Sequence, residues 1–133
     1  MRKLLLILLI LIVCGAILLS FRFLFGGSED DWIKDERGVW VKHGNPSATP
    51  QEVQEQQSAI TLALELYQTK KTEGMNFSSQ CLGTTSGYVI DIVHVPRSQE
   101  DNLQENQCED YKTGKVEDFI EIDKEGNIIR IVK

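Results

Sequence analysis

The hydrophobic pattern of this chain begins with an unbroken apolar run at residues 4–19. Continued through Phe25 as a helix, the segment reaches about 33 Å, which is enough to cross the hydrocarbon core of a bilayer. Arg22 lies within one turn of the far end, where its side chain can extend to the interface. We therefore predict a transmembrane anchor at residues 1–25, with residues 4–25 in the bilayer.

The charges on either side of this run predict its orientation. Arg2 and Lys3 precede it, whereas Glu29, Asp30 and Asp31 follow it. Because the positive flank of a membrane helix stays inside, we expect a cytoplasmic N-terminus and a C-terminal domain outside the cell membrane. A cleaved signal peptide, which would release a secreted domain, is the competing interpretation. The absence of a convincing cleavage site favours the uncleaved anchor.

After a flexible, acidic spacer at residues 26–31, the domain at residues 32–133 begins and ends with strand patterns. Short apolar segments flank the turn 35–38, and the same pattern recurs around the turn 123–127. We therefore predict two β-hairpins, over residues 32–41 and 119–132.

A helix is predicted between these hairpins. Thr49, Pro50 and Glu52 form a capping box with proline in the first turn, and Gly74 is a typical C-terminal stop. The apolar residues that follow the cap recur with helical periodicity and define one buried face: Val53, Ile60, Ala63, Leu64 and Tyr67.

Two more strands are expected near residues 77–82 and at residues 88–95, followed by a polar loop at 98–110. The order ββαββββ predicts an α+β domain in which one helix packs on an antiparallel sheet. This order is cystatin-like in broad topology only. The Gln-x-Val-x-Gly loop of cystatin inhibitors is missing, so the likeness implies no inhibitory activity.

Charge excludes one class of partner. The 133 residues include 20 acidic and 14 basic side chains, a net charge of −6. Three of the basic residues, Arg2, Lys3 and Arg22, belong to the membrane segment. The remaining 11 basic and all 20 acidic side chains give residues 28–133 a net charge of −9. Such a domain repels nucleic acid.

Two cysteines, Cys81 and Cys108, lie in the exported domain. Since an even number of cysteines in an oxidising compartment favours pairing, we predict a disulfide between them. A reactive or metal-binding thiol pair is the alternative. Cys14 lies within the apolar run, where we expect it to serve as an ordinary apolar side chain.

The polar loop and its surroundings offer two weaker signals. Five of its side chains are acidic and could bind Ca²⁺, although their spacing fits no EF-hand and a solvated loop is favoured: Glu100, Asp101, Glu105, Glu109 and Asp110. Asn76 begins an Asn-Phe-Ser sequon on the side of the membrane where glycosylation occurs. We keep it as a candidate glycosylation site.

Candidate catalytic chemistry is limited to His43, His94 and Asp91. Asp91 and His94 point to opposite faces of a regular strand, which excludes a direct dyad. The chain has no phosphate-binding loop, nucleophile elbow, dinucleotide fingerprint or zinc motif. We therefore expect no cofactor and no metal, and the sequence favours a protein that is not an enzyme. A small metal-dependent or histidine-using enzyme, with these three residues converging, is the alternative.

Trp40 and Lys42 are further candidate binding residues. If the neighbouring valines face the core, the indole of Trp40 lies on the outer face beside Lys42, and exposed tryptophans often anchor interfaces. The favoured interpretation instead packs Trp40 under the loop that leads into the helix or against the acidic loop.

Several segments together resemble an uncharacterised family of short archaeal proteins with an N-terminal membrane segment. They are Lys34-Asp35, residues 38–46, Ser79-Gln80-Cys81, residues 91–97 and residues 106–110. The resemblance covers most of residues 32–132. It implies a shared fold with both cysteines in place, and it implies no activity, substrate or catalytic residue.

These observations together predict a single-pass membrane protein with an extracytoplasmic domain. We expect this domain to bind or scaffold another surface component, an unknown protein or ligand.

Overall fold

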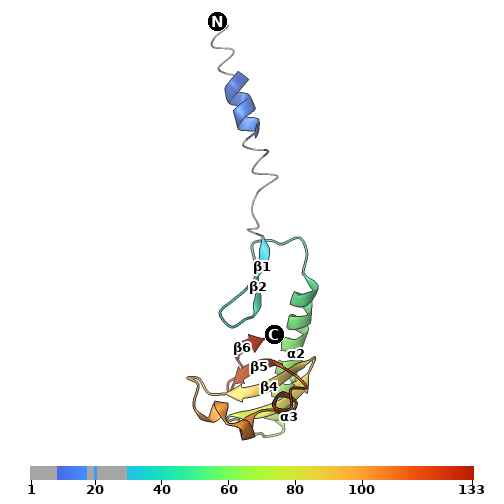
Figure 1. Ribbon diagram of the computed structural model, residues 1–133, viewed down its shortest axis with the longest axis vertical. Coiled ribbons are helices and arrows are strands. Elements are labelled where there is room, and N and C mark those ends of the chain that lie inside the picture. Colours follow the sequence, from blue (N-terminus) through green and yellow to red (C-terminus); the bar gives the residue numbers. More distant parts are fainter. Residues whose placement is uncertain (1–8, 18–19, 21–29) are drawn as a thin grey trace.

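The computed structural model describes residues 9–17, 20 and 30–133 (Figure 1). Strands and helices follow in the order β1 (Asp31–Lys34), β2 (Trp40–His43), α2 (Gln51–Thr72), β3 (Gln80–Thr85), β4 (Tyr88–Val93), α3 (Glu109–Lys112), β5 (Asp118–Asp123) and β6 (Ile128–Val132). The 3₁₀ turns η1 (Glu100–Asn102) and η2 (Gln104–Asn106) lie between β4 and α3. The α+β class and the order of strands around one long helix are confirmed.

Residues 9–17 and Ser20 are helical, and most of the predicted anchor at residues 1–25 and of the spacer at residues 26–31 lies outside the described residues. Within the part of the chain that the structure describes, no helix has both the length and the hydropathy required to cross a bilayer.

The four-stranded sheet corrects one part of the predicted fold. Its order is β3-β4-β5-β6, and the outer pairs are antiparallel, but β4 and β5 run parallel. The sheet is therefore mixed and not antiparallel, which also removes the broad likeness to cystatins. A second, two-stranded antiparallel sheet consists of β1 and β2.

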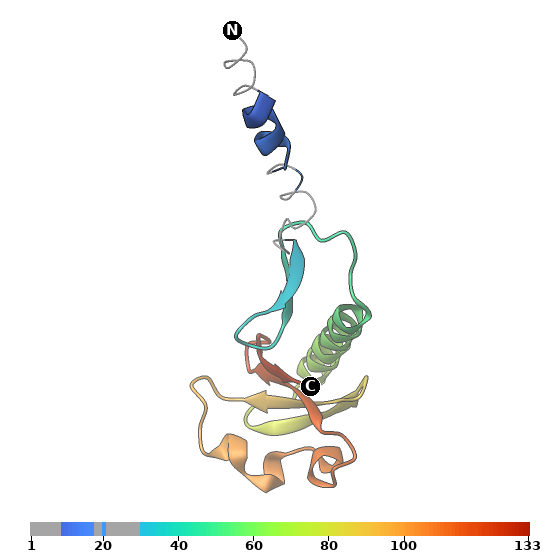
Figure 2. The ribbon, with the colours of Figure 1, turned by 45° about the horizontal axis from the view of Figure 1, so that its top comes forward.

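The parallel pair requires a crossover between the end of β4 and the start of β5. Residues 94–117 form this crossover, and they lie on one side of the sheet while α2 lies on the other (Figure 2). The predicted loop at residues 98–110 is part of it and contains η1, η2 and the start of α3. Hydrogen bonds from side chains to the backbone stabilise these short turns. Because the turns do not depend on an apolar face, the sequence contains no hydrophobic periodicity that would predict them.

Helix α2 forms as predicted, but its first turn differs. The N-cap residue is Pro50, and no side chain caps the helix, so the predicted capping box with Thr49 does not form. Gln54 instead donates its side-chain amide to the carbonyl oxygen of Thr49. Gly74 has a φ of +81° and follows the helix as the predicted stop.

The core lies between α2 and the sheet. Tyr67 is fully buried, its ring stacks on Phe77 with centroids 4.8 Å apart, and its hydroxyl donates to the carbonyl oxygen of Lys124. The remaining buried members of this core are Ala59, Ala63, Leu82, Tyr88, Ile90, Ile92, Ile120, Ile122 and Ile131. The predicted helical face is thus largely confirmed, although Ile60 and Leu64 are only partly buried.

The strand between Phe77 and Leu82 was predicted too early in the sequence. Strand β3 runs to Thr85, and Ser86 and Gly87, with φ values of 50° and 77°, join it to β4. Both positive φ values are typical of a two-residue hairpin turn. β4 ends at Val93, two residues earlier than predicted.

The β1–β2 hairpin confirms the first predicted turn and contacts both the sheet edge and the helix. Ile131 on β6 donates its backbone N–H to the carbonyl oxygen of Arg37 in the hairpin turn (Figures 1 and 2). Buried Gln56 accepts a hydrogen bond from the Trp40 backbone and donates one to the Gly38 carbonyl, both 2.8 Å long. One amide side chain of α2 therefore fixes the hairpin.

We predict that Gly38→Ala is more destabilising than Gly87→Ala. Both glycines have φ values near +80°, but a Cβ on Gly38 would lie 2.4 Å from the Ile131 carbonyl oxygen, whereas none of the atoms around Gly87 lies within 4 Å. Backbone strain should cost both variants about 1 kcal/mol, and the displaced hairpin should cost Gly38→Ala about 1 kcal/mol more. Urea unfolding measures the stability of both variants. Equal losses of stability in the two variants would contradict the close approach of Gly38 to the Ile131 carbonyl oxygen.

Candidate functional site

The candidate site lies on the face of the sheet opposite α2. Since alternate residues of a strand point to opposite faces, the residues of β4 that do not join the α2 core are Val89, Asp91 and Val93. Asp91 pairs in register with Glu121 on the parallel neighbour β5, and Glu121 pairs with Arg130 on β6. The sheet thus places three charged residues side by side under the crossover.

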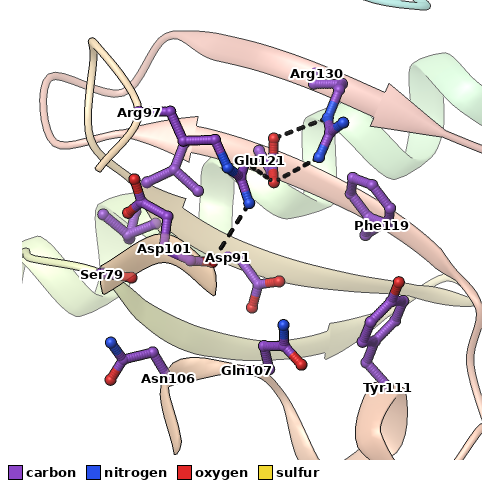
Figure 3. Close-up of a pocket in the computed structure, with 12 residues that line it drawn as sticks. Ser79, Asp91, Arg97, Asp101, Asn106, Gln107, Tyr111, Phe119, Glu121 and Arg130 are labelled. Atoms are coloured by element: carbon purple, nitrogen blue, oxygen red, sulfur yellow. Dashed lines mark hydrogen bonds and ion pairs between the residues drawn. The ribbon is translucent and has the colours of Figure 1, made fainter. Parts of the chain in front are cut away.

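Glu121 lies at the centre of this charged group. It is 5% exposed, and its carboxylate accepts two hydrogen bonds of 3.0 Å from Arg130 (Figure 3). Arg97, which follows β4 in the crossover, donates a third bond of 2.5 Å. Arg97 also contacts the Asp101 backbone oxygen at 3.3 Å. Two guanidinium groups therefore neutralise one buried carboxylate.

These residues surround a small pocket of about 70 Å³. Figure 3 shows the Asp91 carboxyl group pointing into the space between the sheet and the crossover segment that carries Gln107. Polar side chains line much of the wall, and Phe119 with Tyr111 closes one end, where their rings meet edge to face. A volume of this size holds a few water molecules.

Asp91 has an unusual acidity because of this position. Burial raises its pKa, and the negative charge of Glu121 raises it further, while Arg97 lowers it, giving a pKa of about 7. Asp91 is therefore partly protonated near neutral pH, in contrast to an ordinary aspartate.

The Cys81–Cys108 disulfide, predicted from the sequence, lies directly beside Asp91. The sulfur–sulfur distance is 2.00 Å, and the Oδ1 atom of Asp91 lies 3.3 Å from Cys108 Sγ. A disulfide sulfur carries no proton, so only the protonated carboxyl can donate a hydrogen bond in this contact. Cys108 is 2% exposed, whereas Cys81 is half-buried at the sheet edge.

The same three residues form the group of potential metal ligands found among the described residues, with ligand atoms within 4.8 Å of one another. A cysteine binds zinc as a thiolate, and both of these sulfurs are consumed by the disulfide. The oxidised chain therefore offers a metal only the carboxylate of Asp91 at this position.

His94 lies just beyond β4 and belongs to a different cluster. Its Nδ1 atom lies 2.9 Å from Asp101 Oδ1 and 3.0 Å from the Ser98 hydroxyl. Burial alone would raise the pKa of Asp101, but hydrogen bonds from Ser98, His94 and Ser79 lower it below its ordinary value. This carboxylate organises the first turn of the crossover.

The other candidate residues lie on the β1–β2 hairpin. His43 pairs in register with Asp31, at the end of the hairpin opposite the turn that contacts β6 (Figure 1). Lys42 is exposed and donates to the Asn45 side chain at 3.1 Å. Trp40 is half-buried, with the Lys34 ammonium 5.1 Å from the centre of its ring.

The structure does not bring together the three residues on which the alternative enzyme interpretation depends. Asp91 lines the pocket, His94 pairs with Asp101, and His43 lies on the separate two-stranded sheet. A zinc site or catalytic centre that needs all three is therefore not formed in the described part of the chain.

The acidic crossover does not form a calcium cage either. Asp101 is bonded to Ser98, Asp110 to Thr84 and Lys115, and Glu109 to Lys112. Asn76 is exposed in the segment between α2 and β3, where an attached glycan has room. Its glycosylation stays a prediction.

Sequence reasoning identified Asp91 but missed Glu121, Arg97 and Arg130. A signal was present, since Glu121 and Arg130 each interrupt a strand of isoleucines. Opposite charges at such positions indicate a paired cluster on the second face of a sheet. Their mutual register, however, depends on the parallel β4–β5 pairing.

Asp91 predicts a specific pH dependence of stability. Because its folded pKa of about 7 exceeds the ordinary value of 3.8, the folded chain binds the extra proton between these values. The contribution of Asp91 to stability is therefore present at low pH and lost as the pH rises to about 7. Relative to the native chain, Asp91→Asn should gain stability from pH 4.5 to pH 7.5. Urea unfolding at both pH values measures this gain. If the difference in unfolding free energy between the variant and the native chain is the same at both pH values, the raised pKa is contradicted.

Comparisons of this chain with protein-family models, with curated proteins and with solved structures found no match. The fold and site define the chain as an α+β protein with one helix on a mixed sheet and two acidic residues, the buried Glu121 and the half-buried Asp91, beside a disulfide. The resemblance to an archaeal family of membrane-anchored proteins stays a prediction.

Proposed function

We propose that this chain is a single-pass membrane protein whose domain at residues 32–133 lies outside the cytoplasm and binds another surface component. One observation carries the proposal. The helical residues 9–17 expose six large apolar side chains by 48 to 64%: Leu9, Ile10, Leu11, Ile12, Val13 and Ile17. Lipid is the environment that suits such a surface. The finer assignment is an anchor at residues 1–25, with residues 4–25 in the bilayer.

The domain's chemistry supports an extracytoplasmic location. A Cys81–Cys108 disulfide persists in oxidising compartments and is rare in the reducing cytoplasm. Arg2 and Lys3, which precede the apolar run, favour the same orientation, because the cytoplasmic flank of a membrane helix carries an excess of Lys and Arg.

A groove between the hairpin and α2 supports the binding role. It has a volume of about 540 Å³ and combines the half-buried Trp40 with charged residues of both signs: Lys34, Glu52, Glu55 and Lys133. An aromatic anchor with a polar, solvent-accessible rim is the arrangement expected of a protein-binding surface. We propose a surface protein as the partner, with Trp40 as the central contact.

Labelling in intact cells tests the orientation. Glu125→Cys places a thiol in the exposed β5–β6 turn, and we expect a membrane-impermeant maleimide to label it without permeabilisation. The native chain is the control, because its disulfide leaves only Cys14 free. Labelling of Glu125→Cys only after permeabilisation would overturn the proposed orientation. The mass of the mature chain separates an anchor from a cleaved signal, since cleavage would remove the apolar segment.

Cross-linking in isolated membranes tests the binding role. A partner captured by the native chain should be lost from Trp40→Ala and from Glu52→Lys, which changes the groove's charge with little effect on packing. Leu62→Ala is the matched control, because Leu62 is an exposed apolar residue of α2 outside the groove. Equal capture by all four proteins, or no capture by the native chain at low salt, would contradict the assignment.

A further inference from the structure

We propose that Cys81, Cys108 and Asp91 form a thiol–disulfide exchange site, in which a cysteine pair on another protein is the reaction partner and Asp91 transfers a proton to and from Cys108. This activity is separate from membrane anchoring and from binding in the Trp40 groove, and it does not rest on either.

The contacts around Asp91 carry the inference. Its neighbours Val89 and Val93 on the same strand are apolar, so a side chain that only filled space under the crossover would be expected to be apolar too. The chain instead places a carboxyl group 3.3 Å from Cys108 Sγ. The two guanidinium groups nearby bond to Glu121. Asp91 is thus the titratable group in contact with the sulfur.

The two sulfurs differ in the way that the reaction requires. Cys81 is half-buried and is the more exposed of the two cysteines, whereas Cys108 is 2% exposed. A thiolate attacks the sulfur that it can reach and expels the other one. Cys108 would therefore leave as a buried thiolate beside Asp91.

Each surrounding group has a defined part in proton transfer. An ionised Asp91 would repel the departing Cys108 thiolate, whereas the protonated carboxyl can give it a proton. The pKa of about 7 makes both forms of Asp91 accessible near neutral pH. The pocket of about 70 Å³ reaches Asp91 and gives water access to the carboxyl group. The backbone oxygens of Gly83 and Ile90 lie 3.5 and 3.7 Å from Cys108 Sγ, so they can accept a hydrogen bond from the S–H group that reduction creates.

The reaction balances with a dithiol as the co-reactant. One partner thiol loses its proton to water, and the thiolate attacks Cys81 Sγ. A bond forms between these sulfurs, the Cys81–Cys108 bond breaks, and its electron pair leaves with Cys108, which receives the Asp91 proton. The second partner thiol, deprotonated by water, then attacks the partner sulfur of the mixed disulfide and releases Cys81, which is protonated by solvent.

Asp91 regains its proton from water through the pocket. The chain's disulfide has then gained two electrons and two protons, and the partner has become a disulfide. Oxidation of the chain follows the same steps in reverse, with the Asp91 carboxylate accepting the proton of Cys108.

The test is the rate at which dithiothreitol reduces the full chain in detergent micelles, divided by the concentration of dithiothreitol thiolate. From about pH 5.5 to about pH 8.5 we expect this normalised rate to fall about tenfold, because an ionised Asp91 opposes departure of Cys108. The midpoint should lie near pH 7. Asp91→Asn should give a flat profile.

Asp110→Asn is the matched control. Asp110 lies two residues after Cys108, but its carboxylate bonds to Thr84 and Lys115. Those bonds hold the pKa of Asp110 below its ordinary value, so it stays ionised throughout the experiment. Asp110→Asn should therefore keep the step near pH 7.

A second measurement identifies the attacked sulfur. Brief treatment with glutathione, followed by alkylation and peptide mass analysis, should place the mixed disulfide on Cys81. A flat profile for the native chain, an unchanged step in Asp91→Asn, or a glutathione adduct on Cys108 would each overturn the proposal. If Asp91→Asn fails to fold, the native profile and the position of the adduct still decide the question.

Discussion

Replacing both Cys81 and Cys108 with alanine is expected to lower the free energy of unfolding by about 3 to 4 kcal/mol. The bridge joins residues 27 positions apart, and breaking it restores conformational freedom to the unfolded chain. It also attaches the middle of the crossover to β3, on a face of the sheet with few large apolar side chains. We therefore expect the crossover to detach first when the bridge is lost.

Urea unfolding of the full chain in a fixed detergent measures this loss. Hydrogen exchange should show the greatest loss of protection at residues 94–117, with smaller changes in α2. Cys14→Ala is the matched control, since Cys14 is exposed and has no sulfur partner. A loss below about 1 kcal/mol would show that packing of the crossover, and not the bridge, holds it in place.

Glu121→Gln is expected to cost about 2 kcal/mol of stability. The change keeps the side-chain volume but removes the charge that neutralises Arg97 and Arg130. Breaking a buried ion pair typically costs about 3 to 5 kcal/mol, but these guanidinium groups are 40 and 48% exposed, so water compensates part of the loss. The remaining loss of stability arises from the removal of the Glu121 carboxylate, which is almost fully buried in the native chain.

Glu121→Gln should also change the titration of Asp91. Since the negative charge of Glu121 raises the pKa of Asp91, its removal should move the Asp91 transition to lower pH. Carboxyl chemical shifts followed against pH report that midpoint, and urea unfolding reports the stability. Glu125→Gln is the control, because Glu125 is exposed and 3.9 Å from Lys124, a pair worth at most a few tenths of a kcal/mol. An unmoved Asp91 midpoint would contradict the coupling between the two carboxyl groups.

The sequence predicted the features that depend on residues close along the chain better than those that depend on distant residues. Both outer hairpins were predictable because their turns are set by neighbouring residues, such as Asp35, whose carboxylate accepts bonds from the Arg37 and Val39 backbone. Helix α2 was predictable from its period and its glycine stop. The first turn was not, because the helix begins one residue later than predicted, with Pro50 as the N-cap residue and no capping side chain.

The main error was to predict an antiparallel sheet, because β4 and β5 are parallel. The reason for this error is the length of the connection between these two strands. Residues 98–110 have the polar composition of a surface loop, so a simple link between antiparallel strands was expected. The full connection spans residues 94–117, which is long enough to return across the sheet and start β5 beside the beginning of β4. The length of this connection was therefore the feature of the sequence that could have indicated the parallel pairing.

The site shows the same division between local and tertiary information. The two cysteines predicted their bridge because so few pairings existed, and Asp91 was noticeable as a charge within an apolar strand. Its contact with Cys108, and the pairing of Glu121 with two arginines, needed the register of three strands and the return of the crossover. The separation of His43 from His94 likewise followed from their positions, since His43 ends β2 of the small sheet and His94 follows β4 of the other sheet.

The sequence by itself determined the apolar N-terminal segment, the acidity of the domain, the two outer hairpins, the long helix and the pairing of the cysteines. Each of these depends on composition or on residues close along the chain. Only the tertiary structure decided that β4 and β5 are parallel and that Asp91 lies against the disulfide. Those features depend on which distant segments become neighbours, and burial then changes the acidity of Asp91 in a way that no local pattern encodes.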